Sequence, residues 1–595
     1  MGLAPLSPPW AAAAREAERL GYHGGLLDRS RGVPKTIESG RVESTGDSVV
    51  VTLVLLLLAL APPLLYLAAE AWLFDGDWQL PLDDSWIHLV FARSLALGQG
   101  LAFNPRELVA GMTAPLWTAL LGLLALLPGS ILLWAKLAGI AAQAGSVLLV
   151  YAIARRLDLS PARAGVAAGL VAASDWLVWS ALSGMEVNLF VLLMLAGLHR
   201  HLLERTASES GREAPPPVAF LLFALAALAR PEGLLLPLLA AADRFFCPLP
   251  RTAEAPTLRL GLPTRSTWTA VAAGLLLAVL VLAPVAMAFH QMSGTWLPTT
   301  VAAKSSGPPL FFPDARLLST IVGILLAAQP WMTLLALGGV VESLRRLGGP
   351  RDRGLLLALW TLALPLASAL LSSGKEAAVG NFGRYFFPLI PCVVLLGSLA
   401  LAPLPFSRLR AVAVGSRGRR LPLGALLLVV LVTPALFGLA SGLKRYLHTC
   451  SDVRDSNVAL ARWLAPRLPP DALLAVNDVG AFKYLLPNPV LDLAGLVTPE
   501  VTRRRREGAA RGVGTTEVLV GILEERRPDF IIVFPAWFGY PAQHPESFHP
   551  LRVIELPGNI TMGSEMMVLY DTPWTRRPLV AGAEDTALPL PTESR

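Results

Sequence analysis

Long apolar runs constrain this chain more than any other feature of its sequence. The run from Val49 to Ala69 is long enough to cross a bilayer, because a helix of about 20 apolar residues spans roughly 30 Å of hydrocarbon. Further runs follow at 113–127, 131–153, 164–180, 187–203, 217–229, 233–246, 268–290, 317–343, 354–372, 386–403 and 421–441. We therefore expect a polytopic α-helical membrane protein.

The run at 113–127 is shorter than most of the others and follows two carboxylates, Asp83 and Asp84. As a helix it reaches about 22 Å, which is less than the hydrocarbon thickness. We interpret it as an interfacial or re-entrant helix in a first external loop at 72–130. The remaining runs predict about 11 spanning helices.

Arginine clusters in the loops indicate the orientation. If 113–127 does not cross, these clusters fall on one side, which the positive-inside rule makes cytoplasmic. They begin at Arg155, Arg200, Arg244, Arg345 and Arg408. The net charge of +7 therefore reflects topology and indicates no nucleic-acid binding. Residues after about 444 are expected outside the cytoplasm.

Three parts of the chain differ in character. Residues 1–48 lack the apolar core of a cleavable signal peptide, so we expect a disordered cytoplasmic N-terminus. Residues 49–444 form the membrane module. Residues 445–595 predict a soluble extracytoplasmic α/β domain with a loose end after about 575. Its β-like runs are Leu473–Asp478, Pro489–Leu496, Phe530–Phe534, Leu551–Leu556 and Met566–Asp571.

Five polar motifs from separate segments share the external side in this topology. They are PLDDSWIH, SGMEVN, RPEG, LPTTVAAK and NFGRYF. Ionisable groups at membrane depth are usually functional, so one shared site is the simplest explanation.

Asp83 and Asp84 open a stretch with apolar residues at helical spacing, which predicts a helix on the membrane surface. One carboxylate can cap this helix. The other is then available to remove a proton from a sugar hydroxyl. His88 lies four residues after Asp84 and shares its face. It is either catalytic or a histidine held at the interface.

A structural and a functional interpretation are both open for Glu186, Arg230 and Glu232. Glu186 precedes a spanning helix, so it caps that helix or lines the site. Arg230 and Glu232 flank Pro231, and they either form an ion pair that closes a helical hairpin or line the site as well.

Lys304 and Arg384 are rare cations on the external side. Arginine binds phosphate by paired hydrogen bonds, and lysine binds it as a point charge. Both side chains could instead reach ordinary lipid headgroups. Arg384 lies between Gly383 and Tyr385 and is the one that we expect to be buried.

Metal and redox chemistry have no sequence signal. Cys247, Cys392 and Cys450 lack the spacing of a metal or redox site, and no cluster of metal ligands or phosphate-binding loop is present. We predict no required cofactor; a divalent metal is possible but unsupported.

The stretch DDSWIHLVFARSLALGQGLAFNPRELVAGMTAPLW resembles the first external loop of membrane glycosyltransferases of the GT-C fold. Further matches follow in order over roughly residues 80–500: ALSGMEVNLF, ALARPEGLL, GTWLPTTVAAK, GRYFFPLIP and NDVGAFKYLLPNPVLDLAGLVTPE. The chain is similar in particular to the bacterial branch that includes the mycobacterial terminal arabinofuranosyltransferases. It departs from that pattern at Thr299, where the family often has Asn, and at Ala110, where it often has Glu.

This resemblance implies a reaction. The donor would be a polyprenyl-phosphate monosaccharide, and the acceptor a hydroxyl of an envelope glycan or glycolipid outside a bacterial cytoplasmic membrane. Asp83 would be the general base of an inverting transfer, with Asp84 beside it. Lys304 and Arg384 would hold the lipid phosphate, and membrane lipids would surround the protein.

Two other classes of function compete with this one. A translocator of lipid-linked sugars would carry ionisable residues near mid-membrane and on both faces, often with inverted repeats, and we find neither pattern. A non-catalytic envelope scaffold would keep the fold without the reaction. The presence of Asp83, Asp84 and Arg384 favours an enzyme.

Overall fold

The computed structural model describes residues 45–209, 216–248, 260–304, 311–348, 353–371, 382–403, 412–414, 419–421 and 423–580. The chain divides into two units, Met1–Val50 and Val51–Arg595, and the second is the subject below. The prediction of disorder for residues 1–48 lies outside the described residues as far as residue 44, and Thr45–Ser48 belong to helix α2.

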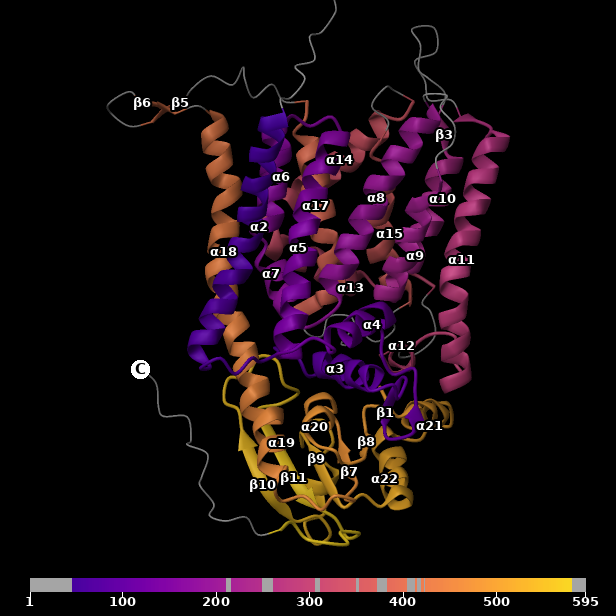
Figure 1. The fold of residues 1–595 in the computed structure, drawn as a ribbon, viewed down its shortest axis with the longest axis vertical. Helices are drawn as coiled ribbons and strands as arrows, with labels where there is room; N and C mark the ends of the chain where they lie inside the picture. The colour runs from indigo at the N-terminus through magenta and orange to yellow at the C-terminus, as the bar shows by residue number, and fades with distance from the viewer. Residues whose placement is uncertain are drawn as a thin grey trace, which may run out of the picture. The chain divides into compact units, whose positions relative to one another are not determined.

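Helices dominate the membrane module. In chain order they are α2 (Thr45–Leu73), α3 (Asp83–Ala96), α4 (Pro115–Leu124), α5 (Ile131–Arg156), α6 (Pro161–Ala172), α7 (Asp175–Leu182), α8 (Val187–Glu209), α9 (Val218–Ala229), η1 (Pro231–Leu234), α10 (Leu235–Phe245), α11 (Arg265–Ser293), α12 (Thr299–Lys304), α13 (Ala315–Ala328), α14 (Pro330–Arg345), α15 (Leu355–Leu371), η2 (Arg384–Leu389), α17 (Ile390–Ala400) and α18 (Leu423–Val453). Short strand pairs accompany them: β1 (Ala102–Asn104) with β2 (Glu107–Leu108), β3 (Cys247–Pro248) with β4 (Leu260–Gly261), and β5 (Val412–Val414) with β6 (Arg419–Leu421). Figure 1 shows the long helices side by side, with α3 and α4 across their lower ends.

The apolar helices confirm a multi-pass membrane protein. Among the described residues, five helices are long and apolar enough to span a bilayer, and two bent helix pairs raise the number to seven. Shorter apolar helices occur at Pro115–Leu124, Val218–Ala229, Leu355–Leu371 and Arg384–Ala400. The count of about 11 spans stays a prediction. The ten residues of α4 are too few to cross, in line with its assignment to the external loop.

Two runs that read as single spans are broken helices. The run at 317–343 forms α13 and α14, and the chain bends by 119° between these two helices. The break falls at Gln329, whose φ of −146° is not helical, because the residue before a proline is disfavoured in the helical region. The run at 164–180 likewise forms α6 and α7, bent by 52°.

A mixed sheet of five strands forms the C-terminal part. Its strands are β7 (Leu474–Val476), β8 (Val490–Asp492), β9 (Phe530–Val533), β10 (Pro550–Glu555) and β11 (Met566–Asp571), in the order β10-β11-β9-β7-β8. All five β-like runs are therefore confirmed. β7 is parallel to β8 and β9, and β11 is antiparallel to β9 and β10. The helices around it are η4 (Arg454–Val458), α19 (Ala459–Leu464), α20 (Gly480–Leu485), α21 (Pro499–Ala510), α22 (Thr515–Arg526) and α23 (Tyr540–Gln543).

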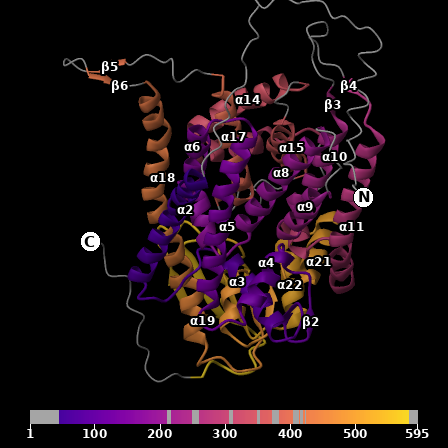
Figure 2. The same cartoon turned by 45° about the horizontal axis from the view of Figure 1, so that its top comes forward.

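The expected domain boundary at 445 falls inside α18, which runs unbroken from Leu423 to Val453. Both views show α18 leaving the bundle toward α19 (Figures 1 and 2). The division into a membrane module and a separate domain stays a prediction.

Side chains of the first external loop share a core with the C-terminal part. Ile87, Phe91 and Phe103 pack in one apolar cluster with Val479 and Phe482. Asn104 binds both backbone groups of Val490 in the edge strand β8, with distances of 2.9 and 3.0 Å. The loop and the C-terminal part therefore form one body beneath the helices.

Glycines allow two pairs of helices to approach closely. A Cβ on Gly339 in α14 would lie 2.0 Å from the backbone oxygen of Leu396 in α17. A Cβ on Gly139 in α5 would lie 2.0 Å from the backbone oxygen of Ala181 in α7. Neither contact can relax by rotation of a side chain.

Gly339→Ala is expected to lower the Tm of the purified protein in detergent, because separating two packed helices costs about 1–3 kcal/mol. Gly323→Ala in α13 is the matched control, since a Cβ there meets no atom within 4 Å. Replacing a helical glycine of that kind stabilises by up to about 1 kcal/mol. Equal shifts in Tm for the two variants would contradict the close packing.

Candidate active site

Helix α3 begins with the two carboxylates that the sequence singled out. Asp83 and Asp84 occupy its first turn, where the positive end of a helix favours negative charge. Adjacent residues of a helix point in different directions, and these two side chains bind different partners.

Asp84 forms an ion pair with Arg384, the first residue of η2. The Arg384 Nη2 donates to Asp84 Oδ2. Arg384 is only 2% exposed, and its Nε and Nη1 have no hydrogen-bond partner among the residues that the structure describes. A buried donor without an acceptor is costly, so this guanidinium is suited to an anionic ligand.

A second ion-pair network lies beside the first. Arg230 donates from Nη1 to Glu186 at 2.6 Å and from Nη2 to Glu232 at 2.8 Å. His88 Nε2 lies 3.6 Å from the other Glu186 oxygen, and His88 Nδ1 lies 3.0 Å from the Thr118 hydroxyl. The hairpin ion pair between Arg230 and Glu232 is therefore present, and it belongs to a larger cluster.

Asp83 faces the C-terminal part. Its carboxylate accepts hydrogen bonds from the Gly480 amide at 2.7 Å, the Ala481 amide at 2.9 Å and the Asn457 side chain at 2.9 Å. Gly480 has room for no side chain, because a Cβ would lie 2.2 Å from the Asp83 backbone oxygen. These contacts tie α3 to the first turn of α20.

Burial raises the pKa of Asp83 and the Asp84 charge adds to the rise, although the three hydrogen bonds oppose it. Asp478 lies two residues before Gly480. Its pKa is well above the usual value because it is buried and because the charges of Asp83 and Asp84 are near. Asp83 and Asp478 therefore retain protons to a higher pH than isolated carboxylates would.

Of these three carboxyl groups, Asp84 lines a pocket of about 260 Å³, together with His88. Thr299 hydrogen-bonds to two of the segments that line the pocket. The Thr299 hydroxyl lies 2.7 Å from the Leu496 backbone oxygen and 3.1 Å from that of Ala110, and its amide donates to Ala110 at 2.9 Å. The pocket therefore lies between the first external loop, α12 and the loop after β8.

The structure brings together seven of the eight residues that the sequence proposed: Asp83, Asp84, His88, Glu186, Arg230, Glu232 and Arg384. Lys304 is the last residue of α12, and its side chain lies outside the described residues. The assignment of phosphate binding to Lys304 stays a prediction.

Three residues of the site were missed from the sequence. Asn457, Gly480 and Thr300 carry no charge, and the first two lie more than 370 residues from the carboxylate that they contact. Gly480 lies in the stretch NDVGAFKYLL and Thr300 in the motif LPTTVAAK, but neither residue stands out there by charge.

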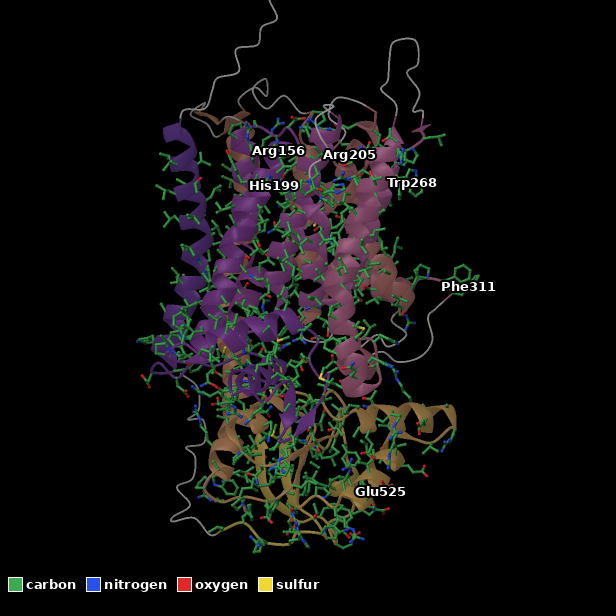
Figure 3. All side chains as sticks on the ribbon, turned by 45° about the vertical axis from the view of Figure 1, so that its right-hand side comes forward. Arg156, His199, Arg205, Trp268, Phe311 and Glu525 are labelled. Carbon is green, nitrogen blue, oxygen red and sulfur yellow. The ribbon has the colours of Figure 1, made fainter. Side chains whose placement is uncertain are left out.

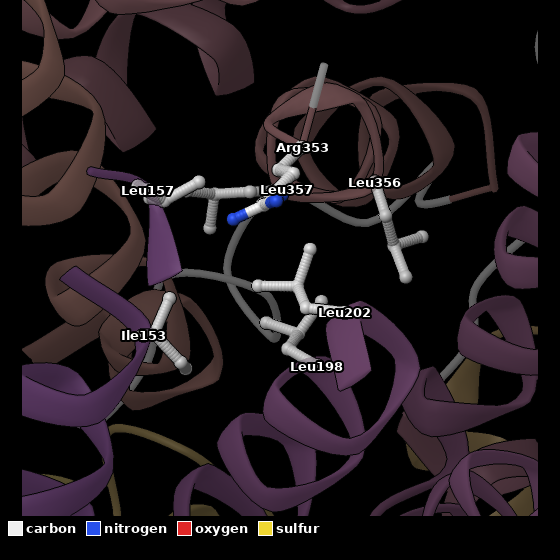
Figure 4. Close-up of a pocket in the computed structure, with 7 residues that line it drawn as sticks. All are labelled: Ile153, Leu157, Leu198, Leu202, Arg353, Leu356 and Leu357. Atoms are coloured by element: carbon white, nitrogen blue, oxygen red, sulfur yellow. The ribbon is translucent and has the colours of Figure 1, made fainter. Parts of the chain in front are cut away.

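A second pocket, of about 250 Å³, is drawn in Figure 4. It is lined by Ile153, Leu157, Leu198, Leu202, Arg353, Leu356 and Leu357. Figure 3 places Arg156, His199 and Arg205 at the end of the bundle away from the sheet. Among the described lining residues Arg353 is the one charged side chain, and the others are leucines and an isoleucine, so they provide no acid or base for group transfer.

In the described part of the chain, no group of three His, Cys, Asp or Glu side chains could hold a metal ion. The prediction that no cofactor is required stays untested.

Asp492 shapes the pocket wall that carries Leu496. Its carboxylate accepts hydrogen bonds from the amides of Ala494 and Val497, each at 2.8 Å. Burial is the largest cause of a shift that raises the pKa of Asp492 from 3.8 to about 6, against these hydrogen bonds.

Stability is expected to depend on pH through Asp492. Between about pH 4 and pH 6 the folded state keeps a proton that the unfolded chain has lost, so the free energy of unfolding falls by about 3 kcal/mol as pH rises. Asp492→Asn should remove this contribution. Chemical unfolding of both proteins at pH 4, 5, 6 and 7 measures it, and parallel curves would refute it.

Comparisons with solved structures show the fold. The crystal structure of the Archaeoglobus fulgidus oligosaccharyltransferase in its apo form matches with a TM-score of 0.54 and 11% identity, over 82% of this chain and 70% of that one. The crystal structure of ArnT from Cupriavidus metallidurans in its apo state matches with a TM-score of 0.53 and 15% identity, over 88% and 98%. The same protein bound to undecaprenyl phosphate matches with a TM-score of 0.52 and 15% identity, over 89% and 98%. The predicted GT-C fold is confirmed.

Sequence comparisons are less informative. A family described as a domain of unknown function, DUF8728, matches residues 448–575. No curated protein sequence matches the chain. The likeness to the arabinofuranosyltransferase branch stays a prediction.

Proposed function

We propose that this GT-C protein transfers a monosaccharide from a polyprenyl-phosphate donor to a hydroxyl of an envelope glycan or glycolipid, at the extracytoplasmic face of a bacterial cytoplasmic membrane. The observation that carries the proposal is the Arg384 guanidinium, buried beside an acidic pair with two nitrogens lacking a partner among the described residues. ArnT, which shares the fold, binds undecaprenyl phosphate.

Arg384 is the proposed phosphate ligand. Its Nε and Nη1 are the donors left over from the ion pair with Asp84, and a guanidinium suits the paired oxygens of a phosphate. Lys304 at the end of α12 would add a second positive charge. A lipid monophosphate carries less charge than a nucleotide diphosphate, so these cations can replace a metal ion.

Asp83 is the proposed general base. A carboxylate offers about four lone-pair sites, and three are taken by Asn457, Gly480 and Ala481. The fourth is available to an acceptor hydroxyl. The raised pKa makes this carboxylate a better proton acceptor than an exposed one.

The transfer is then a single displacement. Asp83 takes the proton of the acceptor hydroxyl. At the same time the oxygen of that hydroxyl bonds to the anomeric carbon of the sugar. The bond from that carbon to the phosphate oxygen breaks, and the electron pair leaves with polyprenyl phosphate, which Arg384 stabilises. Attack opposite the leaving group inverts the configuration.

Arg384→Lys is expected to weaken the binding of undecaprenyl phosphate by about 10-fold or more, since charged hydrogen bonds contribute about 1.5–3 kcal/mol. Arg462→Lys is the control, because Arg462 pairs with Asp77 in an exposed position. Binding of the lipid to purified protein in nanodiscs measures both. Unchanged affinity in Arg384→Lys would exclude this residue as the phosphate ligand.

Asp83→Asn is expected to lower kcat by about 10²–10⁴-fold with donor binding retained, as loss of a general base does. Asn457→Ala is the control: it removes one hydrogen bond to the same carboxylate and keeps its charge, so activity should remain within about 10-fold. Transfer from a polyprenyl-phosphate sugar to a glycan acceptor measures both variants. Near-normal transfer by Asp83→Asn would disprove the assignment, and a translocator would form no glycan product at all.

A further inference from the structure

Thr300 is a buried polar residue that none of the roles above uses. It is 5% exposed, and its hydroxyl is buried without a hydrogen-bond partner among the described residues. It lines the pocket that Asp84 and His88 also line. An unpaired hydroxyl in such a position requires an explanation, because buried polar groups are nearly always hydrogen-bonded.

In other buried threonines of the bundle the hydroxyl is hydrogen-bonded within the chain. Thr361 donates to the Leu357 carbonyl one turn earlier, at 2.7 Å. Thr299, the neighbour of Thr300, bonds to two separate loops. The missing partner is therefore a property of Thr300, which lines the candidate substrate pocket, and a ligand is the natural partner.

The lining of the pocket indicates the chemical class of that ligand. Apart from Asp84 and His88 it consists of apolar side chains, a glycine and the hydroxyls of Thr113 and Thr300. A hydroxyl both donates and accepts, which suits a sugar hydroxyl. Among the residues that the structure describes, no lysine or arginine lines the pocket. Arg384 is already paired with Asp84 and is assigned to the donor phosphate, so a carboxylated sugar would meet Asp84 without a cation of its own.

The position of Thr300 in α12 links it to the donor. Thr300 and Lys304 are four residues apart in the same helix. A donor whose phosphate is held near Lys304 has its sugar directly attached to that phosphate. The sugar is therefore the part of the donor that comes to Thr300.

We infer that Thr300 hydrogen-bonds a hydroxyl of the transferred sugar and that this sugar is an uncharged monosaccharide. The inference rests on the proposed transferase function and names the substrate class of the same pocket. Thr300 acts in recognition, since it contacts a hydroxyl of the sugar and takes no part in the proton transfer.

The test compares three variants of the full-length protein with wild type. Thr300→Val replaces the hydroxyl by a methyl group of similar size, Thr300→Ser keeps the hydroxyl, and Thr361→Val removes a threonine hydroxyl far from the pocket. The substrates are undecaprenyl-phosphate donors carrying neutral pentoses, neutral hexoses or a uronic acid. The readouts are kcat/KM, Tm and the affinity for undecaprenyl phosphate without sugar.

Thr300→Val is expected to lower kcat/KM about 3–10-fold, the size of one neutral hydrogen bond. Its Tm and its affinity for sugar-free undecaprenyl phosphate should equal those of wild type, because no hydrogen bond within the chain is lost. Thr300→Ser should restore most of the activity. Thr361→Val should lower Tm and leave kcat/KM unchanged.

The outcomes separate this inference from the proposed function. If wild type transfers sugar and Thr300→Val has the same kcat/KM, or if the uronic acid is the preferred sugar, the inference is overturned and the transferase function stands. If wild type transfers none of the sugars and does not bind undecaprenyl phosphate, the proposed function is overturned, and this inference with it.

Discussion

The ion pair between Asp84 and Arg384 is the contact on which the site depends. It joins two segments 300 residues apart and places a nearly unexposed guanidinium beside Asp84, which lines the pocket. Charges at such depth persist only when they are paired. Asp84 at the start of α3 therefore positions the cation, and the neighbouring ion pair between Arg230 and Glu186 supports the same region.

The C-terminal part contributes directly to the candidate site. Leu496 lines the pocket, Thr299 links the Leu496 loop to the membrane module, and Asn457 and Gly480 bind Asp83. Apolar side chains of the first external loop share a core with α20. The candidate site is therefore formed by the helical bundle and the C-terminal part together.

Much of this architecture could be predicted from local patterns. Apolar runs identify helices because each must bury its backbone in lipid, and the five β-like runs of the C-terminal part correspond to its five strands. Charged residues on the expected external side identified Asp83, Asp84 and Arg384. The resemblance to GT-C proteins also predicted the fold.

The features that could not be predicted from the sequence all depend on interactions between distant residues. The break at Gln329 turns one apparent span into two helices, which hydropathy cannot detect because both halves are apolar. Gly480 is required only because the Asp83 backbone lies against it. The unpaired state of the Thr300 hydroxyl depends on what surrounds it in space. No window of sequence contains that information.

The separation of Asp83 from its partners has a consequence for biosynthesis. The Gly480 amide is made 397 residues after the carboxylate that it binds. At about 5–20 residues per second, a ribosome needs roughly 20–80 s to cover that interval. A nascent chain therefore makes its first helices long before it can complete this site, and a truncated product that ends before Asn457 lacks all three partners of the Asp83 carboxylate. Assembly is ordered in time, with the candidate site completed late.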